Sequence, residues 1–106
     1  MLSKSDLINY FEKGIKSTSE IKIGTEHEKF IYHKSDLSLV PYSGDVSINS
    51  IFEDFIKDGW IPVNESKNII ALNKDKASIT LEPGGQFELS GAPLKTIHET
   101  CKEINN

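Results

Sequence analysis

Apolar residues recur at helical spacing in three segments of the chain. The first predicted helix can be capped by Ser3 or Ser5 and ends near Gly14. Its apolar stripe consists of Leu7, Ile8, Phe11 and Ile15. An amphipathic helix usually buries its apolar side, so we expect this helix to pack on a sheet.

The second and third predicted helices show the same periodicity. Asp45 or Ser47 can cap the second helix, and Gly59 supplies its end. Its apolar positions are Ile48, Ile51, Phe52, Phe55 and Ile56. Pro93 opens the third helix, whose stripe is Leu94, Ile97, Cys101 and Ile104. We therefore predict that Cys101 is a small buried thiol rather than a nucleophile.

The remaining apolar residues lie in runs typical of strands. The first and longest predicted strand covers residues 20–33, and a loop with a short strand at 37–40 follows it. Three short strands joined by polar turns then form an antiparallel meander, at 60–63, 68–73 and 77–82. Residues 86–90 continue the last of these strands or fold back on it. The pattern predicts an α+β fold, an antiparallel sheet with flanking helices.

Length and charge restrict the classes of protein that remain. With 106 residues, the chain predicts a single domain or the N-terminal fragment of a larger catalytic domain. Its net charge of -4 and its interspersed charges argue against nucleic-acid and membrane surfaces and favour small polar partners. The N-terminus shows no secretory signal, so cytoplasmic residence is the default expectation. All 12 basic residues are Lys, so most of any Arg-based anion clamp would have to come from elsewhere.

Two acidic motifs carry the candidate chemistry. The early motif contains Glu26 and Glu28, and the late motif contains Gln86 and Glu88. In an extended strand, residues two apart share a face, so each pair projects from one side of its strand. Carboxylates that lie this close repel each other unless a cation or proton compensates them. Magnesium prefers oxygen ligands and is often held by one or two carboxylates together with nucleotide phosphates.

A structural explanation competes for each motif. The alternation of any half-exposed strand also produces Glu-X-Glu. Gly84 and Gly85 indicate a bulge, a bend or close approach of a ligand, but a simple hairpin turn explains them too. His27 points to the face opposite its neighbouring glutamates, which favours a packing role. Trp60 and Phe52 are assigned to the core with Phe55 rather than to a base-stacking platform.

Taken together, these motifs resemble a known enzyme family. The late motif, Glu-Pro-Gly-Gly-Gln-Phe-Glu at residues 82–88, lies within a long matching segment at 77–94. Further matching segments are 23–30, 68–72 and 97–101. They resemble the glutamate–cysteine ligases of plant and proteobacterial type, which make γ-glutamylcysteine in the first step of glutathione biosynthesis.

The resemblance implies a glutamine-synthetase-like antiparallel sheet that carries the active site. It implies that the ligands of Mg²⁺, or of Mn²⁺, are Glu26, Glu28, Glu82 and Glu88. It also implies substrate contacts from Gln86 and from the turn residues Gly84 and Gly85. The implied small molecules are ATP, glutamate and cysteine. The glutamate γ-carboxylate would take the terminal phosphoryl group of ATP, and the cysteine amine would then displace phosphate from the acyl-phosphate.

The resemblance leaves several alternatives open. Family members are several times longer, so we expect this chain to match their N-terminal portion and to be inactive alone. Another carboxylate–amine ligase could use the same scaffold, because these motifs do not identify the amine. A non-catalytic binding or assembly module is a further possibility. The expected macromolecular partner is the remainder of the ligase chain or a second copy of this one.

Overall fold

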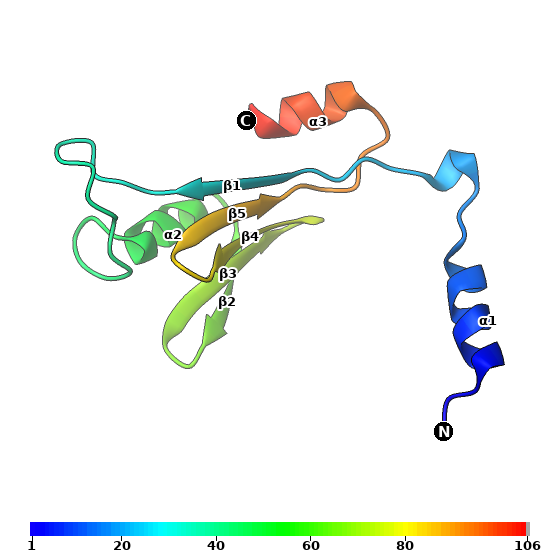
Figure 1. The fold of residues 1–106 in the computed structure, drawn as a ribbon. Helices are drawn as coiled ribbons and strands as arrows, with labels where there is room; N and C mark the ends of the chain where they lie inside the picture. The colour runs from blue at the N-terminus through cyan, green and yellow to red at the C-terminus, as the bar shows by residue number, and fades with distance from the viewer. Residues whose placement is uncertain (106) are drawn as a thin grey trace.

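The fold is an α+β arrangement built on one antiparallel sheet, as the sequence predicts. The computed structural model describes residues 1–105. The helices are α1 (Lys4–Gly14), α2 (Ile48–Lys57) and α3 (Ile97–Ile104), with a 3₁₀ turn at Thr18–Glu20. The strands are β1 (Glu26–Phe30), β2 (Ile61–Glu65), β3 (Asn68–Lys74), β4 (Ala77–Glu82) and β5 (Gln86–Ser90). They form a five-stranded sheet in the order β1-β5-β4-β3-β2 (Figure 1).

Strands β2 to β5 form a continuous meander, and β1 joins it at the β5 edge. Residues 86–90 therefore fold back on β4 instead of continuing it. The two preceding turns contain Ser66 (φ 56°) and Asp75 (φ 53°), residues in the left-handed conformation that tight hairpins require. The predicted meander and its turns are thus confirmed, with strand ends within a few residues of the predicted positions.

Strand β1 is shorter than the 14 residues that the apolar pattern suggests. Only Glu26–Phe30 pairs continuously with β5. Ile23 forms a separate bridge with Leu94, and Tyr32 forms another with Leu39, which is all that remains of the short strand predicted at 37–40. The β-rich composition predicts extended backbone correctly, but a strand also needs a partner over its whole length.

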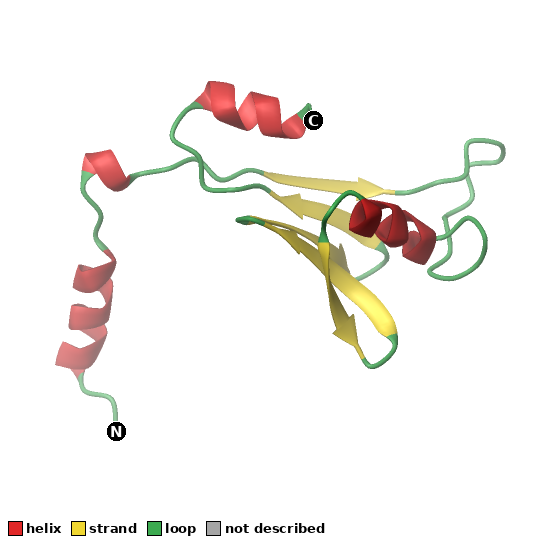
Figure 2. Ribbon diagram, turned by 180° about the vertical axis from the view of Figure 1, so that it is seen from behind, coloured by secondary structure: helices red, strands yellow, loops and turns green. Residues whose placement is uncertain are grey.

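Helix α2 covers the sheet and encloses the core. Ser47 caps it by accepting a hydrogen bond from the Ser50 N–H, and Gly59 follows its end with a φ of 89°. Phe52 is fully buried, and its ring stacks on Phe87 of β5 with centroids 5.0 Å apart. The other buried apolar residues are Ile48, Leu72 and Ile79, with Phe55 and Trp60 packed around them. Figure 2 shows α2 lying across one face of the sheet.

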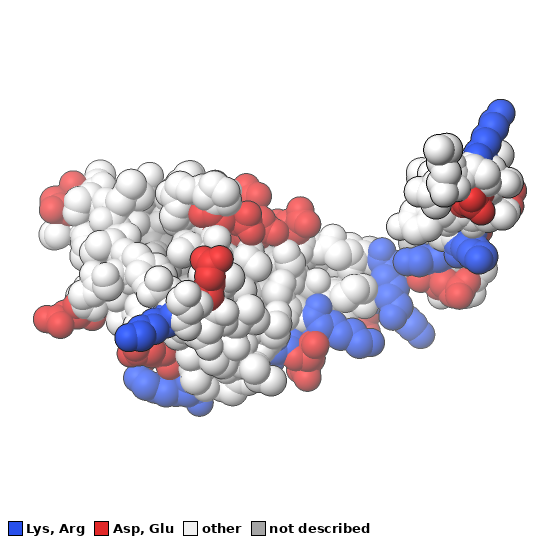
Figure 3. Space-filling model, turned by 90° about the horizontal axis from the view of Figure 1, so that it is seen from below, with Lys and Arg blue, Asp and Glu red and all other residues white. Residues whose placement is uncertain are grey.

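The prediction that α1 packs on the sheet is wrong. Ser3 caps the helix as expected, but none of the helix residues is buried. Phe11 is 73% exposed, and α1 stands apart from the sheet (Figures 1 and 3). An apolar stripe predicts that a helix is covered, but it does not say by what. In the described residues, α2 covers the sheet, and a 3₁₀ turn with an extended segment separates α1 from β1.

Helix α3 also differs from its prediction. It starts at Ile97 with Thr96 as its cap, because the backbone of Leu94 is already paired with Ile23. Cys101 is exposed, which corrects the expectation of a buried thiol, and Thr100 is buried instead. The least exposed residues of the helix, Thr100 and Glu103, are polar, whereas the apolar Ile97 and Ile104 stay exposed.

Surface charge follows the sequence prediction. In Figure 3, acidic and basic side chains are interspersed over the visible face, without a broad patch of either sign. Among the described residues, no helix has the length and apolar character needed to cross a membrane.

Candidate metal and substrate site

The polar side chains of β1, β5 and β4 share the face of the sheet opposite α2. Phe87 of β5 points into the core, so its neighbours in the strand, Gln86 and Glu88, point to the other side. Antiparallel register then aligns the strands, because directly opposed residues lie on the same face. Glu26 is opposite Ser90, and Glu28 is opposite Glu88. Each pair shares a face of its strand, as the alternation predicts, and the register of β1 with β5 brings the two acidic motifs together on one surface.

Glu28 and Glu88 form the central pair of this surface. Directly opposed residues have Cβ atoms about 4.5–5.5 Å apart, which places the two carboxylates side by side. Glu28 is exposed and Glu88 is half-buried. The Ser90 hydroxyl donates a hydrogen bond of 2.9 Å to Glu88 Oε1. This bond orients one oxygen of Glu88 and leaves the other available for a cation or a donor.

Glu82 and Gln86 form a second opposed pair at the hairpin end of β4 and β5. The Thr80 hydroxyl donates a hydrogen bond of 2.8 Å to Glu82 Oε1, in the same way that Ser90 holds Glu88. Thr80 lies opposite Glu88, so Glu82 is one diagonal step from the central pair. Diagonal neighbours in a sheet are about 7–8 Å apart at Cα, which flexible side chains can bridge.

The turn between these strands explains its two glycines without a ligand. Gly85 N–H donates to the Glu82 carbonyl at 3.1 Å, which closes a turn with Pro83 and Gly84 at its centre. Gly84 and Gly85 have φ values of 86° and 78°, a region that suits glycine. A Cβ atom at either position would meet nothing within 4 Å. The structure therefore contains the simple hairpin turn, one of the explanations considered for Gly84 and Gly85. A contact of these glycines with substrate stays a prediction.

The four predicted metal ligands share this face but do not form a closed cage. Across residues 1–105, no three His, Cys, Asp or Glu side chains lie close enough together to hold a metal ion. Glu28 and Glu88 are directly opposed, whereas Glu26 and Glu82 stand on opposite sides of that pair. Such a donor set fits magnesium, which commonly takes one or two carboxylates and completes its shell with phosphate and water.

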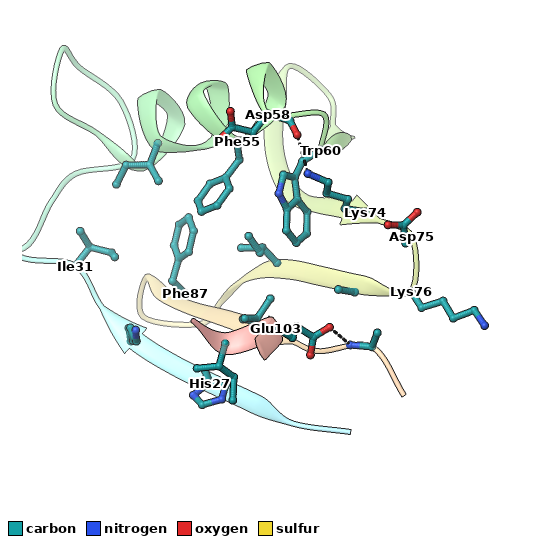
Figure 4. A pocket seen from close by; sticks show the side chains of 17 residues that line it. His27, Ile31, Phe55, Asp58, Trp60, Lys74, Asp75, Lys76, Phe87 and Glu103 are labelled. Atoms are coloured by element: carbon teal, nitrogen blue, oxygen red, sulfur yellow. Dashed lines mark hydrogen bonds between the residues drawn. The ribbon is translucent and has the colours of Figure 1, made fainter. Parts of the chain in front are cut away.

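A groove lies on the other face of the sheet, beside α2. It has a volume of about 770 Å³, and Phe87, Phe55 and Trp60 form part of its apolar lining (Figure 4). His27 also lines it, which confirms that this side chain points away from Glu26 and Glu28. At the rim, Lys74 Nζ donates to the Asp58 carbonyl at 2.7 Å and lies 5.9 Å from the Trp60 ring centre.

Several residues that support the acidic face were missed from sequence. Thr80 and Ser90 hold the carboxylates of Glu82 and Glu88, each by a bond between residues two apart. The alternation of strands β4 and β5 contains this signal, because a hydroxyl residue lies on the same face as each glutamate. Glu103, which lines the groove on the other face of the sheet, was missed as well, because only the position of α3 brings it there.

Opposed carboxylates on the open face of an antiparallel sheet define the class of the site. Such a surface can present oxygen ligands to a cation. The family follows from comparison with known proteins. The model of glutamate-cysteine ligase family 2 (GCS2) matches residues 22–106. This chain therefore belongs to that family.

Curated relatives agree over the whole chain. It is 50% identical to the chloroplastic glutamate–cysteine ligase of Medicago truncatula and 49% identical to that of Nicotiana tabacum. Identity to the Arabidopsis thaliana enzyme is 47%. Each alignment covers 99% of this chain but 20% of the relative, so the chain spans about a fifth of their length. The relatives are named as chloroplastic proteins, and the cytoplasmic residence of this chain stays a prediction.

Proposed function

We propose that this chain acts as the metal-binding part of a glutamate–cysteine ligase. Its membership of the family supports the reaction, and the opposition of Glu28 and Glu88 is the observation that supports the metal role. In this proposal, Glu26, Glu28, Glu82 and Glu88 are shared among Mg²⁺ or Mn²⁺ ions, each held by one or two carboxylates, with phosphate and water completing its shell. The bound cation would neutralise phosphate charge during ATP-dependent ligation.

The chain's own side chains have separate parts in this proposal. The hydroxyls of Ser90 and Thr80 orient Glu88 and Glu82, so that an oxygen of each faces the open side of the sheet. Gln86 lies beside Glu82 at the hairpin end, where its amide can donate to a phosphate or carboxylate and accept from an amine. The turn of Gly84 and Gly85 carries no side chain, which gives a substrate access to the backbone.

The proposed reaction passes through an acyl-phosphate. An oxygen of the glutamate γ-carboxylate attacks the terminal phosphorus of ATP, and the bond from that phosphorus to the ADP oxygen breaks. The cysteine amine then attacks the acyl carbon, phosphate leaves with the electron pair of the acyl C–O bond, and the amine proton passes to solvent. A cation held by these carboxylates would favour the first step, because its positive charge would reduce the repulsion between the two reacting anions.

A chimeric enzyme tests this function. Residues 1–106 replace the matching fifth of the Medicago truncatula ligase, and ADP release is measured with magnesium, glutamate and cysteine. We expect release that needs both amino acids, and a loss of at least about 100-fold in Glu88→Gln. A chimera that works equally well after Glu88→Gln would contradict the metal role. Activity with another amine but not with cysteine would show that the acceptor is a different amine, and the assignment as a carboxylate–amine ligase would stand.

A binding or assembly role is the second candidate, and the exposed apolar surface favours it. The stripe of α1 is uncovered in the described residues, with Leu7 52% and Phe11 73% exposed. The groove beside α2 is also lined by apolar side chains. Apolar surface of this kind is typical of an interface, here with the remainder of a ligase chain or with a second copy. Self-association of the isolated chain would support this candidate.

A further inference from the structure

Helix α3 is tied to the sheet through one carboxylate. Glu103 Oε1 accepts a hydrogen bond of 2.8 Å from the Ala92 N–H, in the segment that follows β5 (Figure 4). Its other oxygen, Oε2, is buried and has no partner among the described residues. The Thr25 hydroxyl, just before β1, is buried and without a partner there as well. A buried acceptor and a buried donor, each unsatisfied, are costly unless they meet.

Gly91 brings these two groups to the same place. A Cβ atom at Gly91 would overlap Glu103 Oε2 and would lie 2.8 Å from Thr25 Oγ1. Both groups therefore border the space that a side chain at this position would fill. The Gly91 N–H also donates to the Thr25 carbonyl at 2.7 Å, which fixes the backbone of both segments. A side chain at this position would have to displace the Glu103 carboxylate.

We propose that Thr25 and Glu103 form a hydrogen-bonded latch, in which Glu103 acts as a positioning residue for Glu26. The Thr25 hydroxyl donates to Glu103 Oε2 while the Ala92 N–H donates to Oε1. The carboxylate thus joins α3, the start of β1 and the end of β5. A small movement of the two side chains satisfies both unpartnered groups.

The latch acts where β1 has least support. Strand β1 is an edge strand, so it pairs only with β5. Glu26 is its first residue, it follows Thr25 directly, and it lies opposite Ser90, the residue before Gly91. Fixing Thr25 therefore fixes Glu26 relative to Glu88. This functional consequence rests on the proposed metal role, whereas the latch itself does not.

Amide hydrogen exchange tests the latch without a metal. We expect exchange at Ala92 and Gly91 to become about tenfold faster in Thr25→Val and in Glu103→Ala, since each removes one partner. Thr25→Ser restores the hydroxyl and should restore slow exchange. Thr18→Val, at an exposed threonine, is the matched control. Unchanged exchange at Ala92 in Thr25→Val would overturn the latch.

Glycine variants give an independent check. Gly91→Ala should accelerate exchange at Ala92 as Glu103→Ala does, because the added methyl displaces the carboxylate. Gly14→Ala is the control, since a Cβ at Gly14 meets nothing within 4 Å. Equal exchange in both glycine variants would contradict the close approach of α3.

Paramagnetic broadening by Mn²⁺ tests the positioning role. In the wild-type chain, we expect broadening of the amide signals of both Glu26 and Glu88. In Thr25→Val, broadening should persist at Glu88 and fall at least about threefold at Glu26, with recovery in Thr25→Ser. Equal broadening at Glu26 in all variants would overturn the positioning role. Absence of broadening in the wild type would overturn the metal role and the positioning role together, while amide exchange would still decide the latch.

Discussion

Glu28 of β1 lies directly opposite Glu88 of β5, on the face of the sheet that α2 leaves open. Like charges in this position repel, and packing alone provides no reason for them to be paired. A cation between the two would reverse the sign of their contribution to stability. This relationship gives predictions both with and without metal.

In the absence of divalent cations, Glu28→Gln should stabilise the fold. The variant removes one of two opposed charges, so we expect the free energy of unfolding to rise by roughly 0.2–1 kcal/mol. Chemical unfolding in the presence of a chelator measures it. Glu65→Gln, at an exposed glutamate opposite Asn68, is the control and should change little. A less stable Glu28→Gln variant would show that the pair is not repulsive.

Gly84→Ala should destabilise the hairpin between β4 and β5. Gly84 has a φ of 86°, where an added Cβ costs about 1–2 kcal/mol although it meets no neighbour. Gly14→Ala is the control, because its backbone is in an ordinary region. The difference between the two free energies of unfolding isolates the conformational cost. Equal stability would contradict the turn geometry.

The start of α3 should depend on pH through Glu99. Hydrogen bonds lower the pKa of this carboxyl from its ordinary value of 4.5, first from the Thr96 hydroxyl and then from the Thr96 and Lys95 N–H groups. A lowered pKa in the folded state means that the cap is fully stabilising above pH 4.5 and is lost as the pH falls through the lowered pKa.

A carboxyl titration by NMR measures this pKa. We expect a value below 4.5 in the wild type and a return toward 4.5 in Thr96→Val, which keeps the backbone donors but removes the hydroxyl. The amide signals of residues 96–99 should change over the same pH range. A wild-type pKa of Glu99 at or above 4.5 would exclude these hydrogen bonds to its carboxylate.

The isolated chain should self-associate through its exposed apolar surface. We expect light scattering to give a mass above the 11.9 kDa of one chain. Phe11→Lys places a charge in the middle of the α1 stripe, so it should shift the mass toward the monomer. Glu12→Gln, at an exposed polar position of α1, should not. A monomeric wild-type chain at high concentration would contradict this expectation.

Local patterns predicted the elements well because their causes are local. Helix α2 has both its cap at Ser47 and its stop at Gly59 within the sequence that forms it. Strand alternation correctly placed Glu26 with Glu28 and Gln86 with Glu88, each pair on one face of its own strand, but the pairing of β1 with β5 is what brings the two pairs together. The motifs also predicted the family, which the comparisons confirmed.

Features that depend on long-range contacts could not be predicted in the same way. The start of α3 moved to Ile97 because Leu94 pairs with Ile23, more than 70 residues earlier. The orientation of α3, which exposes Cys101 and brings Glu103 to Gly91, likewise depends on contacts between distant segments. Periodicity identifies an apolar stripe but contains no information about its partner, which is why the packing of α1 was predicted wrongly.

Manganese binding to the chain tests the central claim most directly. Titration followed by electron paramagnetic resonance should give a dissociation constant of about 1 mM or tighter, weakened at least about tenfold in Glu26→Gln and in Glu88→Gln. Glu65→Gln should bind as the wild type does. Equal binding by all four proteins would contradict the assignment of the acidic face as the metal site.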